Sequence, residues 1–231
     1  MSTLHRLMRT LTAAALAAVA APALSASIGW TTGPGFNGPN GHLGILTNGT
    51  LVEAVSLRGV AGSDLVVDPG GLNIAFERID STFFGFNWGS AGSAGATDAA
   101  WGSILSSFEW QGGSNVTAAG FLSGLTVGHS YQVQFFAARG DCCGSRTATF
   151  GDGAGNLSAA VRHDSYTSIV GSFVADATTQ TIQFIDSTSN PILNAYVLRD
   201  LTAPVPEPGA WATMLLGLAA FAATTGRRRA G

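Results

Sequence analysis

Histidine and serine residues are the first places to look for chemistry in this chain of 231 residues. Its four histidines lie far apart, and none has the short spacing that pairs zinc ligands: His5, His42, His129 and His163. No Gly-x-Ser-x-Gly motif singles out a nucleophile among the many serines. We therefore predict a protein that is not an enzyme, with no catalytic residue, no assigned metal ligand and no organic cofactor.

Structural calcium is the one ion for which the sequence offers ligands, because Ca²⁺ prefers oxygen ligands supplied by loops. Asp141, Asp152 and Asp186 lie in or beside predicted loops and could supply carboxylates. The alternative is that all three are solvated turn residues. The stretch Gly-Asp-Gly-Ala-Gly-Asn at 151–156 has no dinucleotide fingerprint and is predicted to be a turn.

Cys142 and Cys143, the two cysteines of the chain, are adjacent, whereas two cysteines of an exported protein would be expected to pair with each other. Their Cα atoms must lie about 3.8 Å apart across a trans peptide, closer than the roughly 4.4–6.8 Å usual for a disulfide. A strained vicinal disulfide, two reduced thiols and a disulfide to another molecule all remain open. Because Arg139, Asp141 and Arg146 surround the pair, the loop at 139–146 is the best candidate for the rim of a binding site.

Short apolar or alternating runs, separated by Gly, Asn, Asp and Pro, dominate the middle of the chain. The pattern predicts an all-β, two-sheet antiparallel sandwich. A single helical turn is expected around 98–105. The predicted strands are 51–57, 64–68, 72–79, 82–88, 130–138, 146–150, 168–175, 179–185 and 192–198.

Alternation along these strands also predicts the core. The residues expected between the two sheets are Tyr131, Val133, Phe135, Ile182, Phe184, Leu193 and Tyr196. In addition, the sequence Leu122, Leu125, Gly128 and Tyr131 is typical of a tyrosine corner, which fixes a connection between two sheets.

The segments GLTVGHSYQVQFF, RTATFGDGAGN, SIVGSFVADATTQTIQFID and NPILNAYVLRDL resemble a galactose-binding-like jelly-roll module over residues 95–201. The resemblance implies a jelly-roll sandwich, and several proteins of this architecture bind carbohydrate. Sugar sites combine aromatic platforms with hydrogen bonds from Asp, Asn and Arg. Trp88, Trp101 and Trp110 could be platforms, with core packing as the alternative for each. The predicted ligand-binding residues are Arg139, Asp141, Arg146, Asn190 and Trp101.

The first 26 residues have the order of a secretory signal peptide. Arg6 and Arg9 precede an apolar core at 11–20, and small residues follow, with cleavage expected after Ala23 or Ala26. A membrane span is a poorer interpretation because the apolar core is short for a bilayer. The pattern predicts an N-terminal signal helix and export.

The last residues, 204–231, consist of a proline-rich linker, an apolar run and an arginine cluster. The run 209–226 has no charge and would span about 27 Å as a helix, enough for a hydrocarbon core. The three-part order resembles the PEP-CTERM sorting signal, with Pro206, Glu207 and Pro208 as its motif and Arg227, Arg228 and Arg229 as its basic end. The resemblance implies an exosortase as partner, a transmembrane helix before processing, and delivery to the cell surface or exopolysaccharide matrix.

Residues 27–203 remain as one domain, with 13 acidic residues, six arginines and no lysine, which gives a net charge of −7. Nucleic acid is therefore not expected as a partner. We predict a non-catalytic carbohydrate-binding module with polysaccharide as its ligand. The alternative is a structural surface or biofilm protein without a defined ligand.

Overall fold

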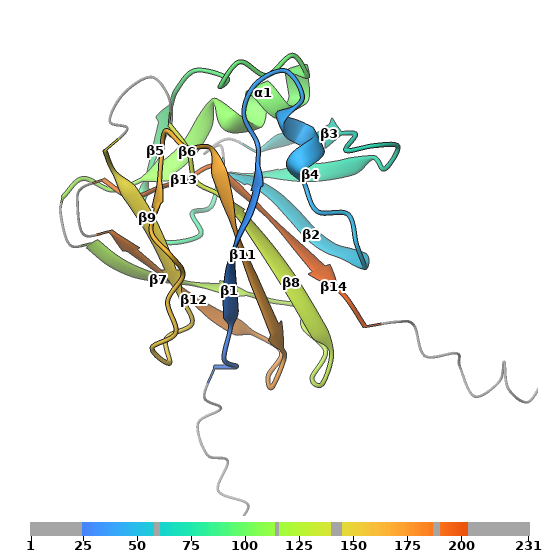
Figure 1. Ribbon diagram of the computed structural model, residues 1–231, viewed down its shortest axis with the longest axis vertical. Helices are drawn as coiled ribbons and strands as arrows, with labels where there is room; N and C mark the ends of the chain where they lie inside the picture. Colours follow the sequence, from blue (N-terminus) through green and yellow to red (C-terminus); the bar gives the residue numbers. More distant parts are fainter. Residues whose placement is uncertain (1–24, 58–60, 114–115, 140–144, 187–189, 203–231) are drawn as a thin grey trace, which may run out of the picture.

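The computed structural model describes residues 25–57, 61–113, 116–139, 145–186 and 190–202. The predicted signal helix, membrane helix and arginine cluster lie outside these ranges. Within them, no helix combines the length and hydropathy needed to cross a bilayer. The described residues form an all-β fold with one short α-helix (Figure 1).

The strands are arranged in three sheets rather than the two that were predicted. The seven-stranded sheet has the order β1 (Gly29–Gly35), β11 (Thr167–Val174), β8 (Ser130–Phe136), β14 (Ala195–Asp200), β2 (Thr50–Leu57), β4 (Ile74–Ile79) and β3 (Gly62–Val67). The four-stranded sheet has the order β10 (Val161–Arg162), β9 (Thr147–Gly151), β12 (Gln180–Asp186) and β7 (Val116–Leu122). The three-stranded sheet consists of β13 (Ile192–Leu193), β6 (Ser107–Trp110) and β5 (Asn87–Ser90).

One strand pair departs from the predicted antiparallel arrangement: β2 and β4 are parallel. Two parallel strands must be joined by a crossover connection, and β3 is part of the connection between β2 and β4. β3 pairs with β4 and forms the edge of the sheet. The expected helical turn is present as α1 (Ala99–Leu105), which begins where Asp98 accepts a hydrogen bond from the Trp101 N–H at 2.7 Å. A short 3₁₀-helix, η1 (Gly41–Gly44), precedes β2.

The prediction of one strand over 82–88 is wrong. Gly85 has a φ of +78°, outside the range of a strand. The N–H groups of Phe83 and Phe84 donate to the Glu109 carboxylate instead of a neighbouring strand. A side chain distant in sequence therefore replaces the sheet ladder here, and only β5 forms at the end of the run.

The predicted strand at 192–198 is divided at Asn194, where the chain passes from the three-stranded to the seven-stranded sheet. Asn194 is fully buried, and its Oδ1 accepts a hydrogen bond from the Ala138 N–H at 2.8 Å. Its Nδ2 donates to the carbonyls of Leu105 and Ser107, each at 3.0 Å. The amide thus satisfies backbone groups that the change of sheet leaves without ladder partners.

The main core lies between the seven-stranded and four-stranded sheets, as the alternation predicted. All seven residues expected there are buried. Phe135 of β8 stacks on Phe150 of β9 at 4.4 Å between ring centroids, and Phe150 meets Phe184 of β12 edge-on at 4.8 Å. Such aromatic pairs add about 0.5–1.5 kcal/mol each beyond the burial of their area.

A second core covers the opposite face of the same large sheet. Trp101 and Ile104 of α1 pack there with Phe36 and with Phe136 of β8. The Trp101 and Phe136 rings meet edge-on at 5.1 Å. Both faces of the large sheet are therefore buried around β8, and α1 occupies one end of the molecule (Figure 1).

Candidate functional site

The three-stranded sheet presents one face to the core and one face away from it. On β6, Glu109 lies beside Trp88 and Leu193, which pack into the main core. Successive side chains of a strand point to opposite faces, so Phe108 and Trp110 lie on the other face. We call this other face, with Asn87, Gly89, Phe108 and Trp110, the β6 face.

Two aromatic rings of the β6 face lie across a glycine on the neighbouring strand. A Cβ atom built on Gly89 would collide with the rings of Phe108 and Trp110. The Trp110 indole is held in place because its Nε1–H donates to the Trp88 carbonyl at 3.0 Å. Trp110 is only half-buried. Its position and fixed orientation are those required of an aromatic platform for a ligand.

Arg139 covers the buried end of this face. Its guanidinium carbon lies 5.2 Å from the centroid of the Phe108 ring, a cation–π arrangement. Phe108 is 1% exposed, whereas Arg139 is half-buried. Planar N–H groups therefore border the aromatic surface and can donate hydrogen bonds to hydroxyl groups of a ligand.

Both ends of the loop at 139–146 are attached to one residue. The Arg139 N–H donates to the His163 carbonyl at 3.1 Å, and the His163 N–H donates to the Arg146 carbonyl at 2.9 Å. The backbones of Arg139 and Arg146 are thus held near each other, one on each side of His163. Asp141, Cys142 and Cys143 lie outside the described residues.

Asn190 lies at the other end of the β6 face. Its backbone has a φ of +52°, a left-handed conformation that asparagine tolerates. Its Oδ1 accepts a hydrogen bond from the Gly113 N–H at 3.0 Å. A Cβ on Gly112 would touch both the Trp110 ring and Asn190 Oδ1, so these two side chains flank that glycine. The structure therefore places Asn190 beside the Trp110 ring.

Trp101, by contrast, is not a surface platform. Its side chain is 0% exposed, and its Nε1–H donates to the Phe36 carbonyl at 3.2 Å inside the second core. Trp101 is the third residue of a helix whose apolar side chains face the large sheet. The prediction that it contacts a ligand is replaced by the core-packing alternative.

Glu109 supports the β6 face from beneath and was not identified from the sequence. Its side chain is fully buried, and burial raises its pKa to about 7 although the N–H groups of Phe84 and Phe83 oppose this rise. The carboxylate accepts from Phe83 at 2.8 Å and from Phe84 at 3.0 Å. It therefore joins the back of β6 to the irregular segment before β5. The only signal in the sequence is an acidic residue within the apolar run Ser-Phe-Glu-Trp.

Asp152, one of the three carboxylates considered for calcium, holds backbone groups of two segments in place. Its carboxylate accepts hydrogen bonds from the N–H groups of Ile28, Ala154 and Asn156 and from the Asn156 side-chain amide. Burial alone would raise the pKa of Asp152, but these hydrogen bonds together lower it. Asp141 and the side chain of Asp186 are not described. Within the part of the chain that is described, no three His, Cys, Asp or Glu side chains form a group that could hold a metal ion.

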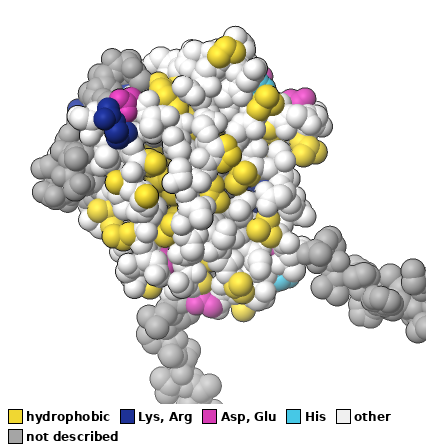
Figure 2. Space-filling model, in the orientation of Figure 1, with side chains coloured by type: hydrophobic (Ala, Val, Ile, Leu, Met, Phe, Trp, Pro, Cys, Tyr) yellow, Lys and Arg dark blue, Asp and Glu magenta, His cyan; other side chains and the backbone are white. Residues whose placement is uncertain are grey.

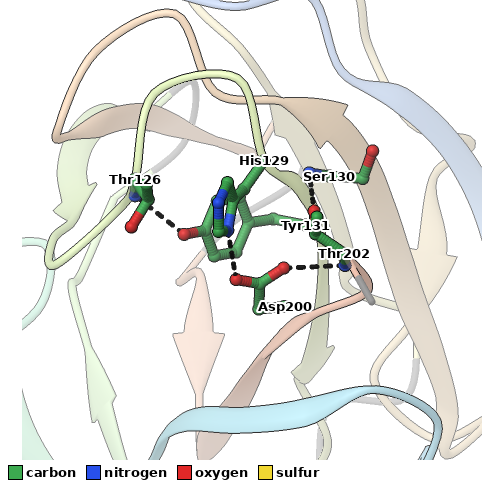
Figure 3. Close-up of polar contacts among 6 residues, drawn as sticks. All are labelled: Thr126, His129, Ser130, Tyr131, Asp200 and Thr202. Atoms are coloured by element: carbon green, nitrogen blue, oxygen red, sulfur yellow. Dashed lines mark hydrogen bonds and ion pairs between the residues drawn. The ribbon is translucent and has the colours of Figure 1, made fainter. Parts of the chain in front are cut away.

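A second polar cluster lies at the opposite end, where the described chain ends (Figure 3). Tyr131 Oη accepts the Thr126 N–H at 2.8 Å, which confirms the tyrosine corner. His129 Nδ1 lies 2.7 Å from Asp200 Oδ2, and Asp200 Oδ1 accepts the Thr202 N–H at 2.8 Å.

These contacts fasten the end of β14 to β8. An aspartate that holds one nitrogen of a histidine is also half of a general-base arrangement. However, the Ser130 hydroxyl points away from the imidazole in Figure 3. The neighbouring serine is therefore not paired with this histidine in the cluster.

A shallow depression of about 360 Å³ lies near this cluster, lined by Ser130, Tyr131, Ser172, Phe173, Val174 and Leu201. Figure 2 shows hydrophobic side chains scattered over the molecular face seen there, with charged side chains mainly at its margins. The depression offers no charged side chain and no aromatic ring in a fixed, exposed position. The β6 face is the better candidate site because it combines a held indole, a guanidinium and two asparagine amides.

Comparison with known protein families, with curated proteins and with solved structures finds no match for this chain.

Proposed function

We propose that this chain is an exported cell-surface or exopolysaccharide-matrix protein whose β domain is a non-catalytic carbohydrate-binding module. We also propose that the sandwich is a jelly roll, a finer description than the all-β fold itself. One observation carries the binding proposal. The Trp110 indole is fixed on the β6 face beside Asn190 and beside the Phe108 ring, against which the Arg139 guanidinium lies.

The composition of the β6 face favours a neutral sugar. A pyranose presents one apolar face to an aromatic ring and hydroxyl groups around its rim, which Arg139, Asn87 and Asn190 can reach with donors and acceptors. The domain carries a net charge of −7, which repels polyanionic glycans at long range. No acid–base pair is proposed for catalysis.

The cellular location of the protein is proposed from the two ends of the sequence. The signal peptide at 1–26 directs export, and the Pro-Glu-Pro motif with its apolar run and arginines directs an exosortase to the C-terminus. Replacing Arg227, Arg228 and Arg229 together by glutamate should impair membrane retention or processing. Unchanged mature mass and localisation of that variant would contradict the sorting proposal.

The binding proposal is tested with the full-length protein, purified in detergent, on an array of neutral and acidic glycans. We expect saturable binding to a neutral glycan that Trp110→Ala or Arg139→Gln lowers at least tenfold. Arg162→Gln is the charge-matched control: Arg162 is an exposed arginine paired with Asp164, it lies next to His163 at the base of the loop at 139–146, and it is not part of the β6 face.

The result can also favour the alternative. If no glycan binds saturably, or if Trp110→Ala binds as well as the unmodified protein with its thermal stability unchanged, the β6 face is not a sugar site. The protein is then better described as a structural surface or biofilm protein without a defined ligand.

A further inference from the structure

Strand β7 forms one edge of the four-stranded sheet and pairs only with β12 among the described strands (Figure 1). Its sequence, Val-Thr-Ala-Ala-Gly-Phe-Leu, contains no charge and no proline. Three of its side chains are exposed on the outer face of the sheet, and Phe121 is 62% exposed. Exposed edges of this kind are open to pairing with another strand.

The backbone groups that β7 directs outward can be identified from the neighbouring pairs. Phe150 of β9 donates its N–H to Ser158 Oγ, and its carbonyl accepts the Ser158 N–H at 2.8 Å, so both groups point away from β12. Phe184 lies opposite Phe150, and its N–H and carbonyl therefore point toward β7. Ala118 faces Phe184, so its N–H and carbonyl form two hydrogen bonds with the carbonyl and N–H of Phe184.

By the same alternation, Thr117, Ala119 and Phe121 direct their N–H and carbonyl groups away from β12. The described residues supply no hydrogen-bond partner for these groups. The edge therefore presents donors and acceptors at three alternate positions, with Ala119 at the centre.

The other edges of the described sheets are protected. In the seven-stranded sheet, edge strand β1 contains Pro34 and edge strand β3 contains Asp64. In the four-stranded sheet, the opposite edge strand β10 has only two residues and includes Arg162. The edges of the three-stranded sheet, β5 and β13, have four and two residues. Charge, proline and shortness all discourage pairing at an edge, and β7 has none of them.

We propose that β7 pairs with β7 of a second copy of this chain, antiparallel and about a two-fold axis at Ala119. In this register, Ala119 exchanges two hydrogen bonds with Ala119 of the other copy, and Thr117 faces Phe121 of the other copy on both sides of the axis.

Three physical features favour this partner. A two-fold axis places identical charges close together, and the absence of charge on β7 removes that repulsion. The small side chain at the axis lets the two backbones approach. Pairing leaves no free β7 edge on either copy, so assembly stops at a dimer with a continuous eight-stranded sheet.

The oligomeric state of the full-length protein in detergent tests the proposal by sedimentation velocity over a concentration series. We expect a monomer–dimer equilibrium. Ala119→Lys places two positive charges at the axis, and Ala119→Pro removes the outward N–H without removing a hydrogen bond to β12. Each should raise the dimer Kd at least tenfold. Val174→Lys is the matched control, since Val174 is 56% exposed on β11, and it should leave the Kd unchanged.

Cysteine cross-linking tests the register independently of these variants. In a background with Cys142→Ser and Cys143→Ser, Ala119→Cys should form a disulfide-linked dimer on oxidation, because hydrogen-bonded antiparallel pairs hold Cα atoms about 5.5 Å apart. Thr117→Cys should not, because Thr117 faces Phe121. A monomer at all concentrations, a larger oligomer, a dimer unaffected by Ala119→Lys, or equal cross-linking at both positions would overturn the proposal.

Discussion

The seven-stranded sheet buries both of its faces around β8, but the side chains that form the two cores are of different kinds. Toward the four-stranded sheet, β8 contributes Tyr131, Val133 and Phe135 to a core of apolar and aromatic side chains. Toward α1, it contributes Gln134 and Phe136 to a core that combines rings with buried amides.

The polar residue on the second face has complete partners. Gln134 is 1% exposed, and its Oε1 accepts the Leu46 N–H at 2.9 Å. Its Nε2 donates to the Gly44 carbonyl and to Ser168 Oγ. Irregular segments need side-chain hydrogen bonds to satisfy their backbone, as Gln134 provides on the second face and Glu109 provides for the segment before β5 on the first. The first face is covered mainly by a sheet and the second by α1 and irregular segments, so amides are a larger part of the second core.

The largest expected effect tests whether the two cores contribute equally. Phe184→Ala on the first face and Trp101→Ala on the second should each lower the free energy of unfolding by about 3–5 kcal/mol, because each removes a fully buried ring. Chemical denaturation of both variants measures this. If Trp101→Ala lowers the free energy of unfolding by less than about 1 kcal/mol, the second core contributes little to the stability of the fold.

The next effect concerns the buried carboxylate of Glu109, which lies on the side of the main core. The pKa of Glu109 is raised to about 7 in the folded protein, so folding favours its protonated form. Its contribution to stability is present at low pH and is lost as pH rises through about 7. The change is on the order of 3 kcal/mol.

Glu109→Gln should remove this loss. One carboxylate oxygen already accepts both backbone N–H groups, so a glutamine carbonyl can replace it. The measurement is the free energy of unfolding from pH 5 to pH 8 for both proteins. Parallel pH profiles would contradict the assignment to Glu109.

The smallest effect concerns the amide on the second face. Gln134→Leu leaves the Leu46 N–H and the Ser168 hydroxyl without this partner, and should lower the free energy of unfolding by about 1–3 kcal/mol. Gln183→Leu on the half-exposed outer face of β12 is the matched control and should have little effect. Equal stability of the two variants would mean that the second face does not depend on its hydrogen bonds.

Particular residues show how much of the molecule could be predicted. The alternation in Ser-Tyr-Gln-Val-Gln-Phe-Phe correctly predicted that Tyr131, Val133 and Phe135 are buried. The same alternation implied that the side chains between them, such as Gln134, are exposed. Gln134 is instead buried in the second core. Strands β1, β6 and β7 were missed because glycine, proline, alanine or a buried glutamate weakens their pattern. The loop arginines and Asn190 were named in advance, whereas Phe108 and Glu109 were not.

The sequence by itself determined the all-β class, the alternating core between two sheets and the tyrosine corner, because period-two burial and turn chemistry are local properties of a strand and its ends. The tertiary structure decided the third sheet, the burial of Trp101 and the position of Glu109 beneath the β6 face. Each of these depends on what lies against a residue from a distant part of the chain. A glutamate that accepts hydrogen bonds from backbone groups about 25 residues away leaves no periodic signal in the sequence.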